Sequence, residues 1–365
     1  VQKSNLPIEG TVRAACIANR TVYLGGSFSR VFQRRMEYAV RWDLQQDPNN
    51  VDVAVKTMAR GVNGVVNAIS SYAGWVVYGG SFTLALQSKG NPLRSGGLVA
   101  WNELKEEWSL VGRSKLNGNV ESMAVFQGQL VVGGKFKSLA GLSVNNVASY
   151  GGDVSSSMGW KSLGGGIPSG QIAAMIADEK FLYVGGDFML HGNLSSRNIA
   201  QWDGSGWSGL QDEACLRRCA RTRDQIACDS ENCELNGPVS SLAVAGGSLF
   251  VSGLFTSAGG KDALHLARYR NREWLSFGAV EGSVFSLVIQ KSFPAATLDQ
   301  QQVQDLSFPA FCLLLGGSFS SVRTSSGVLT ARNLARVCFR SSDVWWWDQV
   351  PLVGGGEVIQ FLAMV

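Results

Sequence analysis

Four of the seven cysteines lie close together and could either bind a metal or form disulfide bonds. Their spacing is C-x3-C-x8-C-x4-C, whereas a zinc site is typically built from a tighter C-x2-C pair or a nearby histidine. The two histidines, His191 and His265, lie in other parts of the sequence. Disulfide bonds therefore explain the cluster better, and four thiols allow three pairings. The clustered residues are Cys215, Cys219, Cys228 and Cys233.

Residues suited to catalysis are sparse. Two histidines in 365 residues argue against a histidine-based triad or metal centre. No nucleophile elbow, zinc-protease motif or phosphate-binding loop occurs. Asp178, Glu179 and Asp187 could be imagined as the acid pair of a glycosidase, but they fall in one turn and one loop with no matching acid in neighbouring segments. We therefore expect no catalytic residue and no cofactor.

The cysteine cluster also carries arginines that could bind an acidic or sulfated partner. Six acidic residues in the same segment outnumber them, so internal pairing and solvation explain the arginines better. The net charge of +4 is too small for a nucleic-acid groove to be the default interpretation. The arginines are Arg217, Arg218, Arg221 and Arg223.

Two N-glycosylation acceptor motifs begin at Asn19 and Asn193, both in expected turns or loops. Together with the clustered cysteines they favour a secreted or cell-surface protein. The longest apolar stretch, residues 308–315, is far shorter than the ~20 residues of a membrane helix. The chain begins with Val and no signal peptide is visible, so we expect a piece of a longer protein.

The elements that must position these residues are predicted by a repeat. One phrase recurs six times, as VYLGGSF, VVYGGSF, LVVGGKF, LYVGGDF, LFVSGLF and LLLGGSF. Each copy comes after an alternating run and a turn, and precedes a segment ending in an aromatic residue, which in five of the six units is followed by a Trp-bearing run. This pattern predicts four short strands per unit. The predicted units are 10–63, 64–117, 118–169, 170–236, 237–281, 282–355 and a partial 356–365.

Six four-stranded units of about 50 residues are typical of a β-propeller, in which each sheet is buried between two neighbours. Gly is abundant (44 residues) and charged residues are few (16%), which argues against a disordered chain or a helical bundle. We predict one all-β propeller domain, with six complete repeats and the start of a seventh. The ring would have six or seven blades.

The unit LYVGGDFMLHGNLSSRNIAQWDGSGWSGL resembles the repeats of the fungal cortical-marker family, extracellular propeller proteins involved in cell polarity. It also resembles the bacterial delta-sixty repeat and, more loosely, the kelch repeat. The resemblance covers nearly all of the chain. It implies a propeller without a shared active site, and fold-level analogy is all that it licenses.

The repeat assigns the remaining candidate residues, three cysteines and a tryptophan, to predicted strands. Cys312 and Cys338 fall on neighbouring antiparallel strands, where they could form a third disulfide or remain two buried thiols, and Cys16 is left as a free thiol. In the run 345–347, alternation buries the outer two tryptophans on one face and turns Trp346 to the other. An exposed Trp346 would indicate an interface.

The expected function is that of a non-catalytic extracellular interaction or structural module. Insertions at about 211–235 and 291–310 would project from opposite faces of the propeller, where they could mediate end-to-end assembly. The expected partners are other proteins, further copies or domains of the same long chain, or glycans, with no nucleic acid and no membrane insertion. The alternatives are a carbohydrate-binding or glycoside-hydrolysing propeller and an intracellular kelch-like adaptor.

Overall fold

The computed structural model describes residues 8–32, 34–46, 54–154, 156, 159–190, 196–219, 233–291, 310–324, 327–340 and 344–348. These residues form an all-β structure with a short helix, α2 (Glu213–Cys219). In this part of the chain, no helix has the length and apolar character needed to cross a membrane.

Six antiparallel sheets with four main strands each succeed one another along the described residues. The first contains β1 (Ile8–Ala18), β2 (Thr21–Val31), β4 (Ala39–Asp43) and β5 (Val55–Thr57). The second contains β6 (Val66–Tyr72), β7 (Trp75–Gly80), β10 (Leu98–Asn102) and β11 (Glu107–Ser109). The third contains β12 (Asn119–Phe126), β13 (Gln129–Lys135), β16 (Val147–Tyr150) and β17 (Trp160–Ser162).

The later three sheets repeat this arrangement. The fourth contains β18 (Gln171–Ala177), β19 (Leu182–Leu190), β20 (Ser196–Trp202) and β21 (Trp207–Gly209). The fifth contains β22 (Val239–Ala245), β23 (Ser248–Gly253), β26 (Leu266–Arg270) and β27 (Glu273–Leu275). The sixth contains β28 (Ala279–Lys291), β29 (Phe311–Thr324), β31 (Leu334–Phe339) and β32 (Trp345–Asp348). Each of the six complete predicted units therefore contributes one sheet, with its strands in chain order.

The connection between the second and third strands is more regular than the loop that the sequence predicts. In three sheets it forms a small hairpin, and in two others a short strand pairs with the second strand. Three of these connections are each fixed by an asparagine that lies just before the first glycine of the unit. The Oδ1 of this asparagine accepts two backbone N–H groups about twenty residues further on. The short strands are β3 (Arg34–Arg35), β8 (Leu84–Ala85), β9 (Leu93–Arg94), β14 (Ser138–Leu139), β15 (Leu142–Ser143), β24 (Ser257–Ala258), β25 (Lys261–Asp262) and β30 (Gly327–Thr330).

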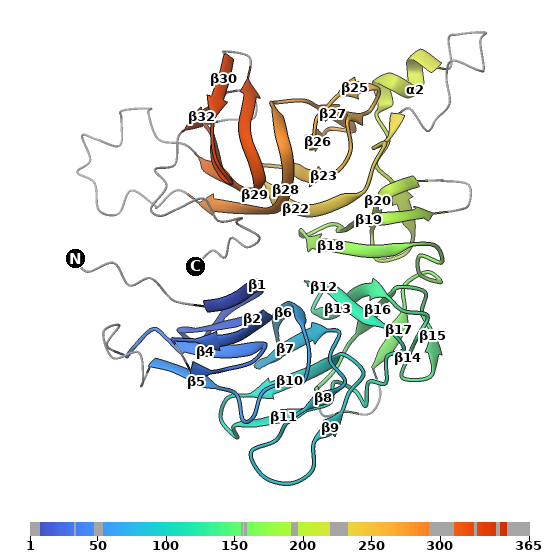
Figure 1. Ribbon diagram of the computed structural model, residues 1–365. Helices are drawn as coiled ribbons and strands as arrows, with labels where there is room; N and C mark the ends of the chain where they lie inside the picture. Colours follow the sequence, from blue (N-terminus) through green and yellow to red (C-terminus); the bar gives the residue numbers. More distant parts are fainter. Residues whose placement is uncertain are drawn as a thin grey trace, which may run out of the picture.

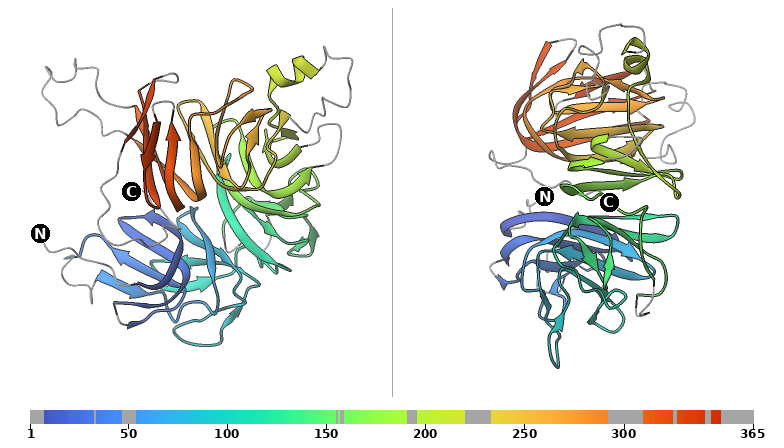
Figure 2. Two further views of the ribbon diagram at one scale, coloured as in Figure 1. Left: turned by 45° about the horizontal axis from the view of Figure 1, so that its top comes forward. Right: turned by 90° about the vertical axis from the view of Figure 1, so that its right-hand side faces the viewer.

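Successive sheets stack through their innermost strands, so that β1 lies beside β6, β6 beside β12, β12 beside β18, β18 beside β22 and β22 beside β28. The sheets form an arc from the blue first sheet to the red sixth (Figures 1 and 2). A glycine in the second strand permits this contact, since a Cβ there would lie 2.4 Å from a Val methyl of the next sheet. The pairs are Gly25 with Val66, Gly79 with Val120 and Gly185 with Val239.

The recurring aromatic residues hold neighbouring units together. In four sheets the last aromatic of the third strand faces the Trp of the fourth strand, with ring centroids 4.9–5.2 Å apart. The indole N–H of that Trp donates to a carbonyl at the end of the preceding unit, as from Trp274 to Leu210 at 2.9 Å and from Trp160 to Val111 at 3.1 Å. Each such Trp therefore contributes both apolar packing and a hydrogen bond between units.

Candidate functional site

The first candidate site is the cysteine-rich insertion between the fourth and fifth sheets. Its two ends are joined by a disulfide bond between Cys215 and Cys233. Helix α2 lies near β25 and β27 (Figure 1). The backbone N–H of Glu213 donates to the carbonyl of Arg272 at 2.9 Å, and the side chains of these residues also approach each other. The base of the insertion is therefore fixed to the fifth sheet.

Asp212 is the polar centre of this base, and its side chain is fully buried. Its carboxylate accepts the backbone N–H groups of Trp274 and Cys215, both at 2.8 Å, and pairs with the ammonium of Lys261 at 3.2 Å. Burial raises the pKa of Asp212, but these hydrogen bonds and the Lys261 charge lower it more, so its pKa lies below the ordinary value. The buried carboxylate therefore stays ionised and ties the insertion to two strands.

Glu234, on the other side of the disulfide, is also buried. Its carboxylate accepts the backbone N–H of Arg197 at 2.8 Å and the side-chain amide of Gln211 at 3.1 Å. The end of the insertion at Glu234 is thus connected to the fourth sheet, and the end at Asp212 to the fifth. Buried charges with several hydrogen-bond partners define a single geometry, because an alternative one would leave them unsatisfied.

The candidate interface residues of the insertion are described in part. Arg217 is exposed on α2 and pairs with Glu213 at 3.0 Å, as the charge balance of the segment predicted. Arg218 and Cys219 lie at the end of α2, and their side chains are outside the described residues. Arg221, Arg223 and Cys228 also lie outside them.

The second disulfide among the described residues joins Cys312 and Cys338, which are direct cross-strand partners in the sixth sheet. Trp346 pairs with Cys338 in the register and is 36% exposed, whereas Trp345 and Trp347 pack against the core between the fifth and sixth sheets. Trp346 therefore lies on the opposite face of the strand, as alternation predicts. Cys16 is a half-buried free thiol on β1, and burial raises its pKa.

The first glycosylation candidate, Asn19, is exposed in the tight turn between β1 and β2, with a φ of 50°. This position leaves its amide open to modification. Asn193, His191 and most of the insertion at 291–310 lie outside the described residues. His265 has a structural place instead, because it adopts a φ of 63° just before β26 and its Nδ1 lies 3.0 Å from the carbonyl oxygen of Val280.

The second candidate site is a groove of about 970 Å³ between the fourth and fifth sheets. The rings of Phe181, Tyr183 and Tyr269 line it, and each is half-buried. Polar side chains complete the lining, among them those of Asp178, Glu179, Gln201, Gln211, Arg270, Asn271 and Arg272. Gln211 and Arg272 also contact the insertion, so the groove and the insertion are neighbours.

A comparison with the second and third sheets shows which side chain differs at this groove. Tyr72 and Phe126 stand at the end of the first strand in the second and third sheets, and both are buried against the following sheet. Asp178 occupies the equivalent position in the fourth sheet. The short carboxylate turns back to cap its own turn, accepting the N–H groups of Lys180 and Phe181 at 2.7 Å. Between the second and third sheets and between the third and fourth, an aromatic ring fills this space, whereas between the fourth and fifth sheets it is open.

The geometry of the groove does not resemble an acid pair. Both oxygens of Asp178 are used, since the hydroxyl of Tyr183 donates to Oδ2 at 3.1 Å. Burial and the nearby Asp178 raise the pKa of Tyr183, and burial is the main cause that raises the pKa of Tyr269 to about 12. Both phenols therefore remain protonated donors near neutral pH. Among the described residues, no three His, Cys, Asp or Glu side chains cluster in a way that could hold a metal ion.

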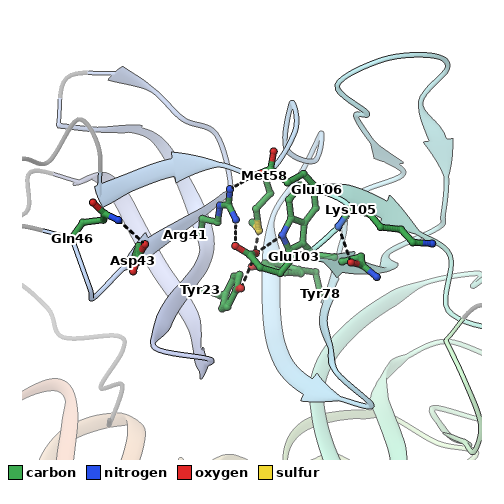
Figure 3. Close-up of polar contacts among 11 residues, drawn as sticks. Tyr23, Arg41, Asp43, Gln46, Met58, Tyr78, Glu103, Lys105 and Glu106 are labelled. Carbon is green, nitrogen blue, oxygen red and sulfur yellow. Dashed lines mark hydrogen bonds and ion pairs between the residues drawn. The ribbon is translucent and has the colours of Figure 1, made fainter.

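A third polar cluster lies between the first and second sheets (Figure 3). The carboxylate of Glu103 accepts the hydroxyl of Tyr23 at 2.9 Å and the indole N–H of Trp101 at 2.8 Å, and it also pairs with Arg41. Arg41 reaches Glu106 at 2.6 Å and its guanidinium lies over the Trp101 ring. These contacts join residues of the first and second sheets, so we interpret the cluster as a link between them, although the Nε of Arg41 is buried without a hydrogen-bond partner.

Comparisons with known proteins identify no family for this chain. No family model matches it, and no curated protein matches it. Among solved structures it is similar to one titled "Structure of YjhT", at 13% sequence identity and a TM-score of 0.46. That similarity covers 94% of this chain and 99% of the other.

Proposed function

We propose that the chain is a non-catalytic β-propeller module of an extracellular or cell-surface protein, and that the cysteine-rich insertion is its protein-binding surface. The observation that carries this proposal is the way the insertion is anchored. A disulfide, two buried carboxylates and a backbone hydrogen bond hold its base against two sheets. A loop without a binding role needs no such base, whereas a presented loop must be held in one orientation.

Two further observations support an extracellular location. Disulfide bonds persist in oxidising compartments, and the described residues contain two of them, one in the insertion and one in the sixth sheet. The glycosylation candidate Asn19 is exposed in a turn, where an attached glycan would meet solvent. The partner class that fits best is another protein or a further copy or domain of the same chain.

The ring is proposed to continue beyond the sixth sheet. In four of the described sheets, a glycine of the second strand packs against a Val or Ile of the next unit. That Val or Ile lies two residues after the glycine with which the next unit begins. Gly316 holds this glycine position in the sixth sheet, and the sequence Gly356-Glu357-Val358 repeats the start of a unit. Residues 356–365 lie outside the described residues, and we assign them from the sequence to the start of a seventh unit.

The experiment that tests the proposed surface keeps the base and changes the loop. Replacing residues 218–232 with a Gly-Ser linker retains Cys215, Cys233 and the Asp212 contacts, so the propeller should fold. Sedimentation velocity and chemical cross-linking on the surface of the source cells would then compare this variant with the natural chain. Loss of self-association or of cross-linked partners is expected, and unchanged association would refute the proposal.

A further inference from the structure

We propose that the groove between the fourth and fifth sheets binds a short, uncharged oligosaccharide. Its volume of about 970 Å³ lies at the upper end of the ~300–1,000 Å³ typical of small-molecule sites, which gives room for several sugar units. The inference does not depend on the role of the insertion. A binding site here would exist whether or not the insertion binds another protein.

The aromatic wall of the groove suits the apolar face of a pyranose ring. Phe181 and Tyr183 lie next to each other on and beside β19, with ring centroids 6.0 Å apart. Tyr269 projects from β26, and its ring is fixed by Trp274 at 4.9 Å and by a hydrogen bond from its hydroxyl to the carbonyl of Gln211 at 3.1 Å. The three rings are therefore held in place before a ligand arrives, which reduces the entropy lost on binding.

The polar part of the groove offers hydrogen bonds that the protein itself does not use. Among the described residues, the side chains of Gln201, Ser208 and Asn271 have no hydrogen-bond partner, although they line or border this groove. An amide carries both donors and an acceptor, and a hydroxyl can act as either. These groups match the hydroxyls of a sugar, which also donate and accept.

The charges of the groove nearly balance. The lining carries the carboxylates of Asp178 and Glu179 and the cations of Lys180, Arg270 and Arg272, and Arg272 is already close to Glu213 outside the groove. A peptide that adds a strand to a sheet is a poorer fit, because β19, β20, β23 and β26 are each paired on both sides. The edge strand that lines the groove, β21, has only three residues. An uncharged chain of rings with hydroxyl edges satisfies the shape, the aromatic wall and the free polar groups together.

The test measures binding of defined hexasaccharides to the full chain by saturation-transfer NMR and titration calorimetry. The probes are neutral hexamers of β-linked glucose, β-linked N-acetylglucosamine and α-linked mannose, with a sulfated hexasaccharide for comparison. Phe181→Ala removes a ring from the wall, while Phe181→Tyr keeps it. Gln201→Trp fills the groove from β20. Trp346→Ala removes an exposed aromatic outside the groove and serves as the control.

Binding of at least one neutral hexasaccharide is expected, with affinity reduced about tenfold or more by Phe181→Ala. Phe181→Tyr and Trp346→Ala should retain it, and Gln201→Trp should abolish it without lowering the melting temperature. Binding of none of the neutral probes, binding of the sulfated probe alone, or equal binding by the natural chain and Gln201→Trp would overturn the proposal. Because the linker variant at 218–232 leaves the groove intact, it should bind the sugar normally, which separates this test from that of the insertion.

Discussion

The contact between Gly185 and Val239 allows a quantitative test of how the sheets stack. A Cβ added at Gly185 would lie 2.4 Å from a methyl carbon of Val239 and 2.9 Å from its Cβ. Carbon atoms in contact prefer separations of about 3.5–4.0 Å, so the two sheets would have to move apart by about 1 Å. Val239 is buried at 2% exposure and has little space to turn into. Gly185→Ala should therefore destabilise the fold by about 1–3 kcal/mol, the usual cost of overpacking.

Urea unfolding monitored by tryptophan fluorescence would measure this change. Gly206→Ala is the matched control, because no atom lies within 4 Å of the added Cβ and the backbone there needs no positive φ. It should alter stability by less than about 1 kcal/mol. Val239→Ala removes the methyl at 2.4 Å and keeps the Cβ at 2.9 Å, so it relieves part of the collision, and the double variant should be more stable than the sum of the single changes by about 1 kcal/mol. Equal stability of Gly185→Ala and Gly206→Ala, or simple additivity in the double variant, would refute the stacking argument.

Three further changes test the packing and the insertion. Trp274→Phe leaves the carbonyl of Leu210 without its indole donor and should destabilise the protein by about 1–3 kcal/mol in a denaturant titration, whereas Trp346→Phe should change stability by less than about 0.5 kcal/mol. Replacing Cys215 and Cys233 together with Ser opens a loop of 18 residues and should cost about 3 kcal/mol, measured against the natural chain under non-reducing conditions. Asp212 has a lowered pKa in the folded state, so its carboxylate stabilises the fold above its unfolded pKa of about 3.9 and loses this effect as the pH falls through the folded value. Asp212→Asn should therefore lower the melting temperature at pH 7 and flatten its decline in the acid range, and parallel acid profiles for the two proteins would contradict the assignment.

The sheets could be predicted because the sequence patterns of the four strands recur in the same order in each unit. The alternating run, the glycine-bearing second strand and the terminal aromatics recur from unit to unit, so a chance match in one would not have misled the assignment. The short hairpins could not be predicted in this way. They depend on a side chain such as Asn63 reaching the backbone of Thr83 and Leu84, about twenty residues further on, and the recurrence of this asparagine before a glycine does not by itself say which backbone groups it contacts.

The candidate sites were predictable to different degrees. Cys312 and Cys338 face each other because their strands are neighbours, as the repeat indicates, whereas the pairing of Cys215 with Cys233 was one of three possibilities. The groove required the structure. Asp178 stands where Tyr72 and Phe126 fill the corresponding spaces, but Ala18 and Ala245 hold this position in the first and fifth sheets, so an alignment of the units alone does not single out the fourth.

The most direct test of the proposed function is site-specific photo-cross-linking on the source cells. A photoreactive residue at Arg217, exposed on the disulfide-anchored insertion, would be compared with one at Asp203, exposed in a turn of the fourth sheet. If the insertion binds a protein, position 217 should give discrete adducts that position 203 does not give. These adducts should be lost when residues 218–232 are replaced with a linker. The same adducts from both positions, or none from position 217, would contradict the proposed function.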